Sequence, residues 1–202
     1  KEHLMKNLLK LLPIILSFSL ATTLNVDGVE YTTIQSAIDD AEEGDIVLVY
    51  QGVYYENLNI NKTITLASLA LYDDLSIWYE IDPTTEEYIV INDNILNTII
   101  DGSQPVDEDF SSAIVVQSPE DDCISPVIMG FTITGGMGTQ VTEMVPQAGE
   151  FEVQGEESGE IELVEVDQMI GGGLFSYLTN ADIHHNQSHH PAPRGRSCRH
   201  SR

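Results

Sequence analysis

Positive charge is almost absent from most of this chain. The 202 residues include 33 aspartates and glutamates but only 8 lysines and arginines. Between Thr22 and Pro193, Lys62 is the only lysine or arginine, and all but one of the acidic residues lie in that span. Such a surface repels phosphate groups, which excludes nucleic acid and anionic lipid as partners. Two explanations of the acidity stay open, namely solubility in high salt and binding of calcium, a hard cation that prefers carboxylate and carbonyl oxygens.

Cysteines and long apolar runs are also scarce. With only Cys123 and Cys198, the chain has no disulfide framework and no CxxC metal motif. The apolar stretch at residues 11–20 is too short to anchor the chain across a membrane. It follows the basic residues 5–10 and ends in a small-x-small sequence, so residues 1–21 are predicted to be a bacterial-type secretory signal peptide. A short buried helix is the alternative, and the first interpretation predicts a secreted or cell-surface protein without a stable membrane span.

The segment from Tyr31 to Gly44 predicts a short helix. Thr32 or Thr33 can cap its start, and Gly44 can end it because glycine tolerates positive φ. Its apolar residues recur with the helical period and form one face: Ile34, Ala37, Ile38 and Ala41.

Closely spaced strands are predicted to follow the helix. Residues 46–50, 54–60 and 64–66 favour strands, and turns at 51–52 and 61–62 separate them. These gaps leave no room for crossover helices, so a parallel sheet can form only if the chain coils into a solenoid. The expected core of that solenoid consists of Ile46, Leu48, Leu58, Ile60, Ile64, Leu66, Ile99, Ile114, Val116, Ile128, Phe131, Ile133, Leu174 and Ile183.

The sequence TIQSAIDDAEEGDIVLVYQGVYYENLNINKTITLAS, which ends at Ser68, resembles the start of a parallel β-helix domain of the pectin lyase-like superfamily. Similar coil-like segments recur up to Asn186, at residues 98–102, 113–116, 127–136, 171–176 and 181–186. The resemblance implies an all-β fold, a right-handed parallel β-helix with a short N-terminal capping helix. The pairing of GFTITGG with GGGLF is typical of this architecture and does not indicate an activity.

The domain is expected to span residues 22–186, with inserts near 72–97 and 139–168. We expect an N-terminal fragment of a larger protein, whose open last coil favours edge-to-edge self-association. The tail at 187–202 has four arginines and no acid, and is predicted to be either a disordered or non-native end or a basic interaction tail.

Each insert predicts a hairpin. In the first, Asp82-Pro83 is typical of a turn between strands at 76–81 and 87–91. Trp78 and Tyr79 can either stack on a sugar ring, which makes them candidate carbohydrate-binding residues, or pack the insert onto the solenoid. In the second insert, residues 150–154 and 160–163 alternate around a glycine-rich loop.

No complete catalytic constellation is found. Gly52–Glu56 resembles a stretch of the pectin methylesterases, but the later catalytic motifs of that family have no counterpart. Pectate lyases, which share the fold, use aspartates for calcium and a lysine or arginine as base, and Lys62 lies in a turn that suits this role poorly. Asp101, Asp121 and Asp122 are the candidate calcium ligands and the candidate members of a carboxylate pair for glycoside hydrolysis.

Two histidines and two asparagines lie near the end of the predicted domain. His184 and His185 are predicted on a strand, where neighbours point to opposite faces, which argues against a shared metal. Asn180 and Asn186 are expected in turns, with side chains bonded to the backbone of the neighbouring coil.

Three functions follow from the resemblance and the composition. The first is a secreted protein that binds or processes extracellular polysaccharide or a cell-surface glycan. The second is a non-catalytic surface or adhesion scaffold, and the third is a polysaccharide lyase or carbohydrate esterase. The sequence leaves open whether the chain is an enzyme.

Overall fold

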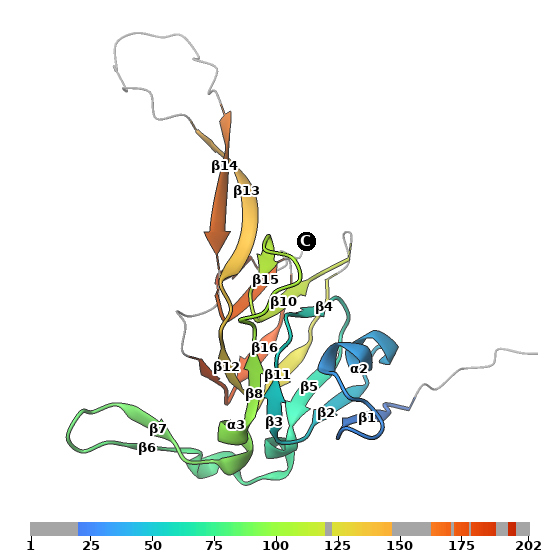
Figure 1. Cartoon of the computed structure of the whole chain (residues 1–202), viewed down its shortest axis with the longest axis vertical. Coiled ribbons are helices and arrows are strands. Elements are labelled where there is room, and N and C mark those ends of the chain that lie inside the picture. Colours follow the sequence, from blue (N-terminus) through green and yellow to red (C-terminus); the bar gives the residue numbers. More distant parts are fainter. Residues whose placement is uncertain are drawn as a thin grey trace, which may run out of the picture.

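The computed structural model is an all-β protein with few helices (Figure 1). It describes residues 20–119, 123–146, 163–170, 172–177, 179–188 and 194–196. The predicted signal peptide at residues 1–21 lies almost wholly outside this part, so its assignment stays a prediction.

Three parallel sheets make up the body of the protein. The first contains β1 (Thr23–Val26), β2 (Ile46–Val49), β5 (Thr65–Ser68), β11 (Val127–Met129) and β16 (Asp182–His184). The second contains β3 (Gly52–Tyr54), β8 (Thr98–Asp101), β12 (Thr132–Thr134) and β17 (Gln187–Ser188). The third contains β4 (Leu58–Ile60), β10 (Ile114–Gln117), β15 (Leu174–Tyr177) and β18 (Arg194–Arg196).

Successive strands enter these three sheets in rotation. β2, β3 and β4 join the first, second and third sheet in turn, and β5, β8 and β10 repeat that order. The next two passes, β11–β12–β15 and β16–β17–β18, do the same. Within these three sheets, the strands of each pass therefore pair in parallel with the strands one pass earlier or later in the chain.

One apolar core lies between the sheets and receives side chains from all three. In the first sheet a continuous ladder of matched positions points inward: Leu24, Val47, Leu66, Ile128 and Ile183. Leu58, Ile114 and Leu174 form the equivalent ladder in the third sheet. Stacking like residues at one register position keeps the interior filled from one pass to the next, because each side chain packs on its counterpart above and below.

Most of the expected core is confirmed, but the facing of two strands was predicted wrongly. Val47 and Val49, not Ile46 and Leu48, join the interior cluster of the first sheet. In β8, Ile100 is fully buried in the core while Ile99 is only half buried. β2 is a continuous apolar run and β8 has two adjacent isoleucines, so in neither strand does an apolar–polar alternation tell one face from the other.

The strand predicted at residues 54–60 is in fact two strands, β3 and β4, in different sheets. The break lies at Tyr55–Asn57, where the Asn57 side-chain amide donates to the carbonyls of Gly102 and Ser112, each at 3.0 Å. These bonds fix the bend to the next pass of the chain. β3 also begins at Gly52, which had been assigned to a turn.

The predicted helix is present as α2 (Ile34–Asp40), and it covers the start of the core. Thr33 caps it by accepting from the Ser36 N–H at 3.3 Å, and Gly44 follows with φ of +90°. The Gln35 side chain pairs with the backbone of Asn59 in β4, accepting from its N–H at 2.8 Å and donating to its carbonyl at 3.2 Å. An amide side chain thus completes the hydrogen bonding of an otherwise open strand edge.

Two antiparallel hairpins extend away from the parallel sheets (Figure 1). The first hairpin pairs β6 (Tyr79–Ile81) with β7 (Tyr88–Val90) around the predicted turn, and three short helices flank it: η2 (Leu69–Tyr72), η3 (Leu75–Ile77) and α3 (Asp93–Asn97). The strand predicted to start at residue 76 starts only at Tyr79, because the residues before it form η3. The second hairpin pairs β13 (Gly138–Pro146) with β14 (Leu163–Ile170), and β9 (Phe110–Ser111) joins the base of β13. The strand predicted at 150–154 and the first three residues of the strand predicted at 160–163 lie outside the described residues, and the described hairpin starts earlier, at Gly138, and ends later, at Ile170.

Two short strands, β17 and β18, lie in the predicted tail at residues 187–202. They extend the second and third sheets by one strand each. The remaining residues of 187–202 lie outside the described part, and the domain boundary at residue 186 stays a prediction.

Candidate functional site

Aromatic rings gather on the first hairpin and meet edge to face. We call Trp78, Tyr79 and Tyr88 the aromatic hairpin face. The ring centroids of Trp78 and Tyr79 are 5.2 Å apart, and those of Tyr79 and Tyr88 are 5.0 Å apart. In the hairpin register Tyr88 lies opposite Ile81, so Tyr79, Ile81 and Tyr88 share one side of the two strands. Tyr79 and Tyr88 are 38% and 71% exposed, which leaves their rings open to a ligand.

Trp78 differs from the two tyrosines because it is half buried. It packs against a small apolar cluster of Ala70, Val90 and Ile95. Its backbone carbonyl also accepts from the Ile91 N–H at 2.9 Å. Of the two roles considered for Trp78 and Tyr79, Trp78 therefore has contacts suited to packing the insert onto the body, while Tyr79 presents a ring to solvent.

The base of the hairpin is tied together by Asp73. Its carboxylate accepts from the side-chain amides of Asn92 at 2.9 Å and Asn94 at 2.8 Å. These bonds, that from Asn92 first, lower the pKa of Asp73. At the far end the Asp82 carboxylate accepts from the N–H groups of Thr84 and Thr85, which lowers the pKa of Asp82 and fixes the predicted turn. The hydrogen bonds of Asp73 and Asp82 thus fix both ends of the hairpin that carries the aromatic hairpin face.

A histidine pair adjoins Trp78. The rings of Trp78 and His185 are 5.3 Å apart, and Nδ1 of His185 lies 2.6 Å from Nδ1 of His184. The expectation that these neighbours point to opposite faces was wrong, because β16 ends at His184 and His185 adopts φ of +52°. Burial lowers the pKa of His185, and the charge of His184 lowers it further.

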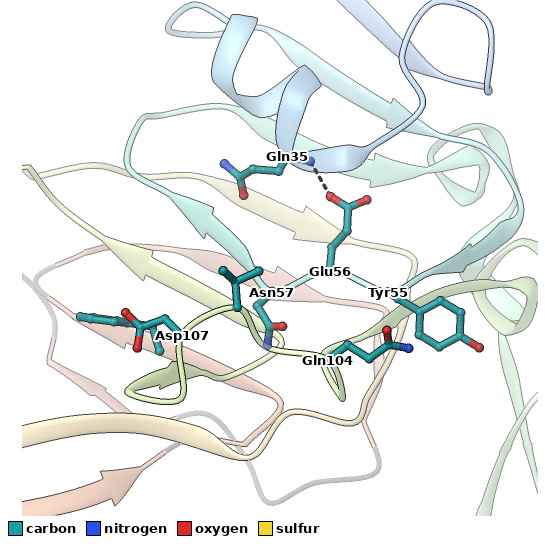
Figure 2. A pocket seen from close by; sticks show the side chains of 8 residues that line it. Gln35, Tyr55, Glu56, Asn57, Gln104 and Asp107 are labelled. Atoms are coloured by element: carbon teal, nitrogen blue, oxygen red, sulfur yellow. Dashed lines mark hydrogen bonds between the residues drawn. The ribbon is translucent and has the colours of Figure 1, made fainter.

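A separate pocket of about 360 Å³ opens beside α2 (Figure 2). The bend between β3 and β4 supplies Tyr55, Glu56 and Asn57, and Gln35 comes from the helix. The remaining lining residues, Gln104, Val106, Asp107 and Phe110, come from the segment between β8 and β10. Among the residues that the structure describes, no lysine or arginine lines the pocket.

Glu56, the last residue of the esterase-like stretch, is engaged with the helix. Its two carboxylate oxygens accept from the backbone N–H groups of Ile34 and Gln35, both at 2.9 Å, and Figure 2 shows it turned toward the start of α2. A carboxylate at a helix N-terminus satisfies donors that have no partner inside the helix. This contact explains the glutamate of that stretch without any catalytic role.

Lys62 has a similar role at the other end of the same helix. Its ammonium donates to the carbonyls of Asp39 at 3.0 Å and Ala41 at 2.9 Å. The buried Asp45 is also fully engaged, since it accepts from the N–H groups of Thr22 and Glu42. The charged residues of the opening motif therefore hold the first pass of the chain together.

The structure does not test the candidate calcium site, because only one of its three predicted ligands, Asp101, lies among the described residues. Asp121 and Asp122 lie outside that part of the chain. Asp101 is at the end of β8, where its Oδ1 accepts from the Ser103 N–H at 3.0 Å. Within the described ranges no group of three or more histidine, cysteine or acidic residues is placed to hold a metal ion.

Asn186 bonds the neighbouring pass as predicted, accepting from the Phe131 N–H and donating to the Ile128 carbonyl, both at 2.9 Å. Asn180 does not, because its amide donates to the Cys123 sulfur at 3.4 Å. The pocket residues Gln104 and Phe110 were missed, since a loop glutamine and a lone phenylalanine carry no signal in a single sequence.

Comparisons with models of protein families, with curated proteins and with solved structures found no match. Among the residues that the structure describes, no helix is long and apolar enough to cross a membrane.

Proposed function

We propose that this chain is a secreted right-handed parallel β-helix protein of the pectin lyase-like superfamily, and that it binds extracellular polysaccharide through the aromatic hairpin face. The proposal concerns binding without turnover.

The architecture is supported by the order of the strands. Each pass of the chain adds one strand to each of three parallel sheets, and the interior side chains stack from pass to pass. A chain that does this without crossover helices coils as a solenoid, and right-handed crossovers are strongly preferred between parallel strands.

The observation that carries the binding function is the exposure of Tyr79 and Tyr88 on a braced hairpin. Aromatic rings bring a large, rigid contact area and stack on the apolar faces of sugar rings. Tyr79 and Tyr88 already hold each other edge to face, so little side-chain freedom is lost when a ligand binds.

Binding rather than catalysis is supported by the contacts of the charged motif residues. Glu56, in the esterase-like stretch, and Lys62, which the sequence already placed poorly for the role of a lyase base, are both bonded to the backbone of α2 and its flanks. A group fixed in this way is poorly placed to exchange protons with a substrate.

The test is retention of the protein by a panel of neutral and acidic polysaccharides in affinity electrophoresis, with and without calcium. We expect retention by at least one neutral polymer, weakened about tenfold or more by Tyr79→Ala and Tyr88→Ala. Tyr72→Ala is the matched control, because Tyr72 is 67% exposed on the same insert and has no ring contact among the described residues. A protein that no polymer retains, or hairpin variants that bind like the wild type, would overturn the proposal.

A further inference from the structure

The pocket beside α2 has the lining of a sugar site, and it lies on the parallel-sheet body, formed by none of the residues of the aromatic hairpin face. We propose that this pocket binds a single neutral sugar residue of a glycan. The inference rests on the proposed function for its ligand class but uses none of the residues that carry that function.

The lining combines open rings with unused hydrogen-bonding groups. Tyr55 and Phe110 are 56% and 51% exposed, so each can cover an apolar sugar face. Neither the Tyr55 hydroxyl nor the Gln104 amide has a hydrogen-bond partner among the described residues, and Figure 2 shows the Tyr55 ring pointing away from the helix-bound Glu56. An amide offers both donors and an acceptor, which matches pairs of neighbouring hydroxyl groups.

The floor of the pocket is rigid. Asn57 is held by its bonds to Gly102 and Ser112, and Glu56 is held by the helix. A Cβ on Gly102 would lie 2.7 Å from Cα of Ala113, so only glycine allows the two segments to approach this closely. Phe110 is fixed by its backbone, since its N–H donates to the Asp107 carbonyl at 3.2 Å and β9 pairs with β13. A preformed floor reduces the entropy lost on binding.

The negative charge of the lining favours a neutral ligand over an anionic one. The carboxylates of Glu56 and Asp107 line the pocket without a cation, so a uronate or sulfated sugar would meet repulsion from both. The volume of about 360 Å³ is near the lower limit for small-molecule sites, which favours one sugar ring over a long oligosaccharide.

The experiment is an NMR titration of the full chain with ¹⁵N-labelled side-chain amides. The probes are cellohexaose, mannohexaose and xylohexaose as neutral ligands and hexagalacturonate as the acidic ligand. We expect one neutral probe to shift the Gln104 and Asn57 amide signals, and Gln104→Ala and Tyr55→Ala to weaken that binding at least about fivefold. Both residues are exposed, so these variants should fold, and Gln51→Ala is a control because Gln51 is exposed and is not among the residues that line the pocket.

The two proposals fail separately. If Tyr88→Ala abolishes polysaccharide retention while no neutral probe shifts the pocket signals, the pocket proposal is wrong and the hairpin proposal stands. If the pocket signals shift and Tyr88→Ala has no effect on retention, the hairpin proposal is wrong and the pocket proposal stands. Hexagalacturonate that binds the pocket as tightly as the neutral probes would also overturn the pocket proposal, because the lining would then not select on charge.

Discussion

Replacing Glu56 by glutamine tests whether the esterase-like stretch is structural. The carboxylate accepts from two backbone N–H groups, each at 2.9 Å. A hydrogen bond to a charged group contributes about 1.5–3 kcal/mol net, and we take the lower end because Glu56 is only half buried. Glutamine keeps one acceptor but turns an NH₂ group toward the second N–H. We therefore expect Glu56→Gln to lower the free energy of unfolding by about 1.5–2 kcal/mol, and Glu56→Ala by about 2–3 kcal/mol.

Urea denaturation followed by far-ultraviolet circular dichroism measures both values, provided that the slope m does not change. Glu87→Gln is the matched control, because Glu87 is exposed and its side chain has no hydrogen bond within the described ranges. That variant should stay within about 0.5 kcal/mol of the wild type. The reasoning is refuted if Glu56→Gln is as stable as the wild type and instead abolishes a catalytic activity toward a polysaccharide.

Three further predictions concern the core, a close approach and pH. Phe131→Ala removes a fully buried ring and should lower the free energy of unfolding by about 3–5 kcal/mol, seen as a shift of the urea midpoint. Gly136→Ala places a Cβ against the backbone of a neighbouring pass and should yield insoluble protein, whereas Gly52→Ala, which meets only a tyrosine ring at 3.2 Å, should remain soluble. The lowered pKa of His185 means that the unfolded chain binds the proton more readily, so stability is complete above the ordinary value of 6.5 and falls as the pH drops through it. Thermal unfolding from pH 8 to pH 5 should show this loss, and His185→Asn, which tolerates positive φ, should reduce it.

Much of the strand arrangement could be predicted from local patterns. The helix face from Ile34 to Ala41 and the inward positions of Leu58, Ile60 and Ile64 follow from spacing and apolar character. Which side chains of Ile46–Val49 point into the core could not be predicted, because all four residues are apolar and Leu48 is buried on the outer face of the strand. Neighbouring strands decide the facing there, and a single sequence does not say which strands are neighbours.

The candidate site was only partly accessible from the sequence. Trp78 and Tyr79 stand out as aromatics in an acidic insert, and the hairpin turn at Asp82 was predictable from its residues. The partnership of Tyr79 with Tyr88 depends on hairpin register, and that of Trp78 with His185 joins segments far apart in the chain. The pocket beside α2 depends on three segments that only the fold brings together.

The way in which the first hairpin leaves and rejoins the sheets makes it an exchangeable cassette. It departs after β5 and returns before β8, and each of these strands is held in its own sheet by strands on both sides. The bonds between Asp73 and Asn92 and Asn94 close the base of the insert, and Trp78 and Val90 pack it against Ala70 and Ile95. Hairpins of different length and chemistry that keep these contacts could replace the segment beyond Trp78, which would turn the sheets into a carrier for new recognition loops.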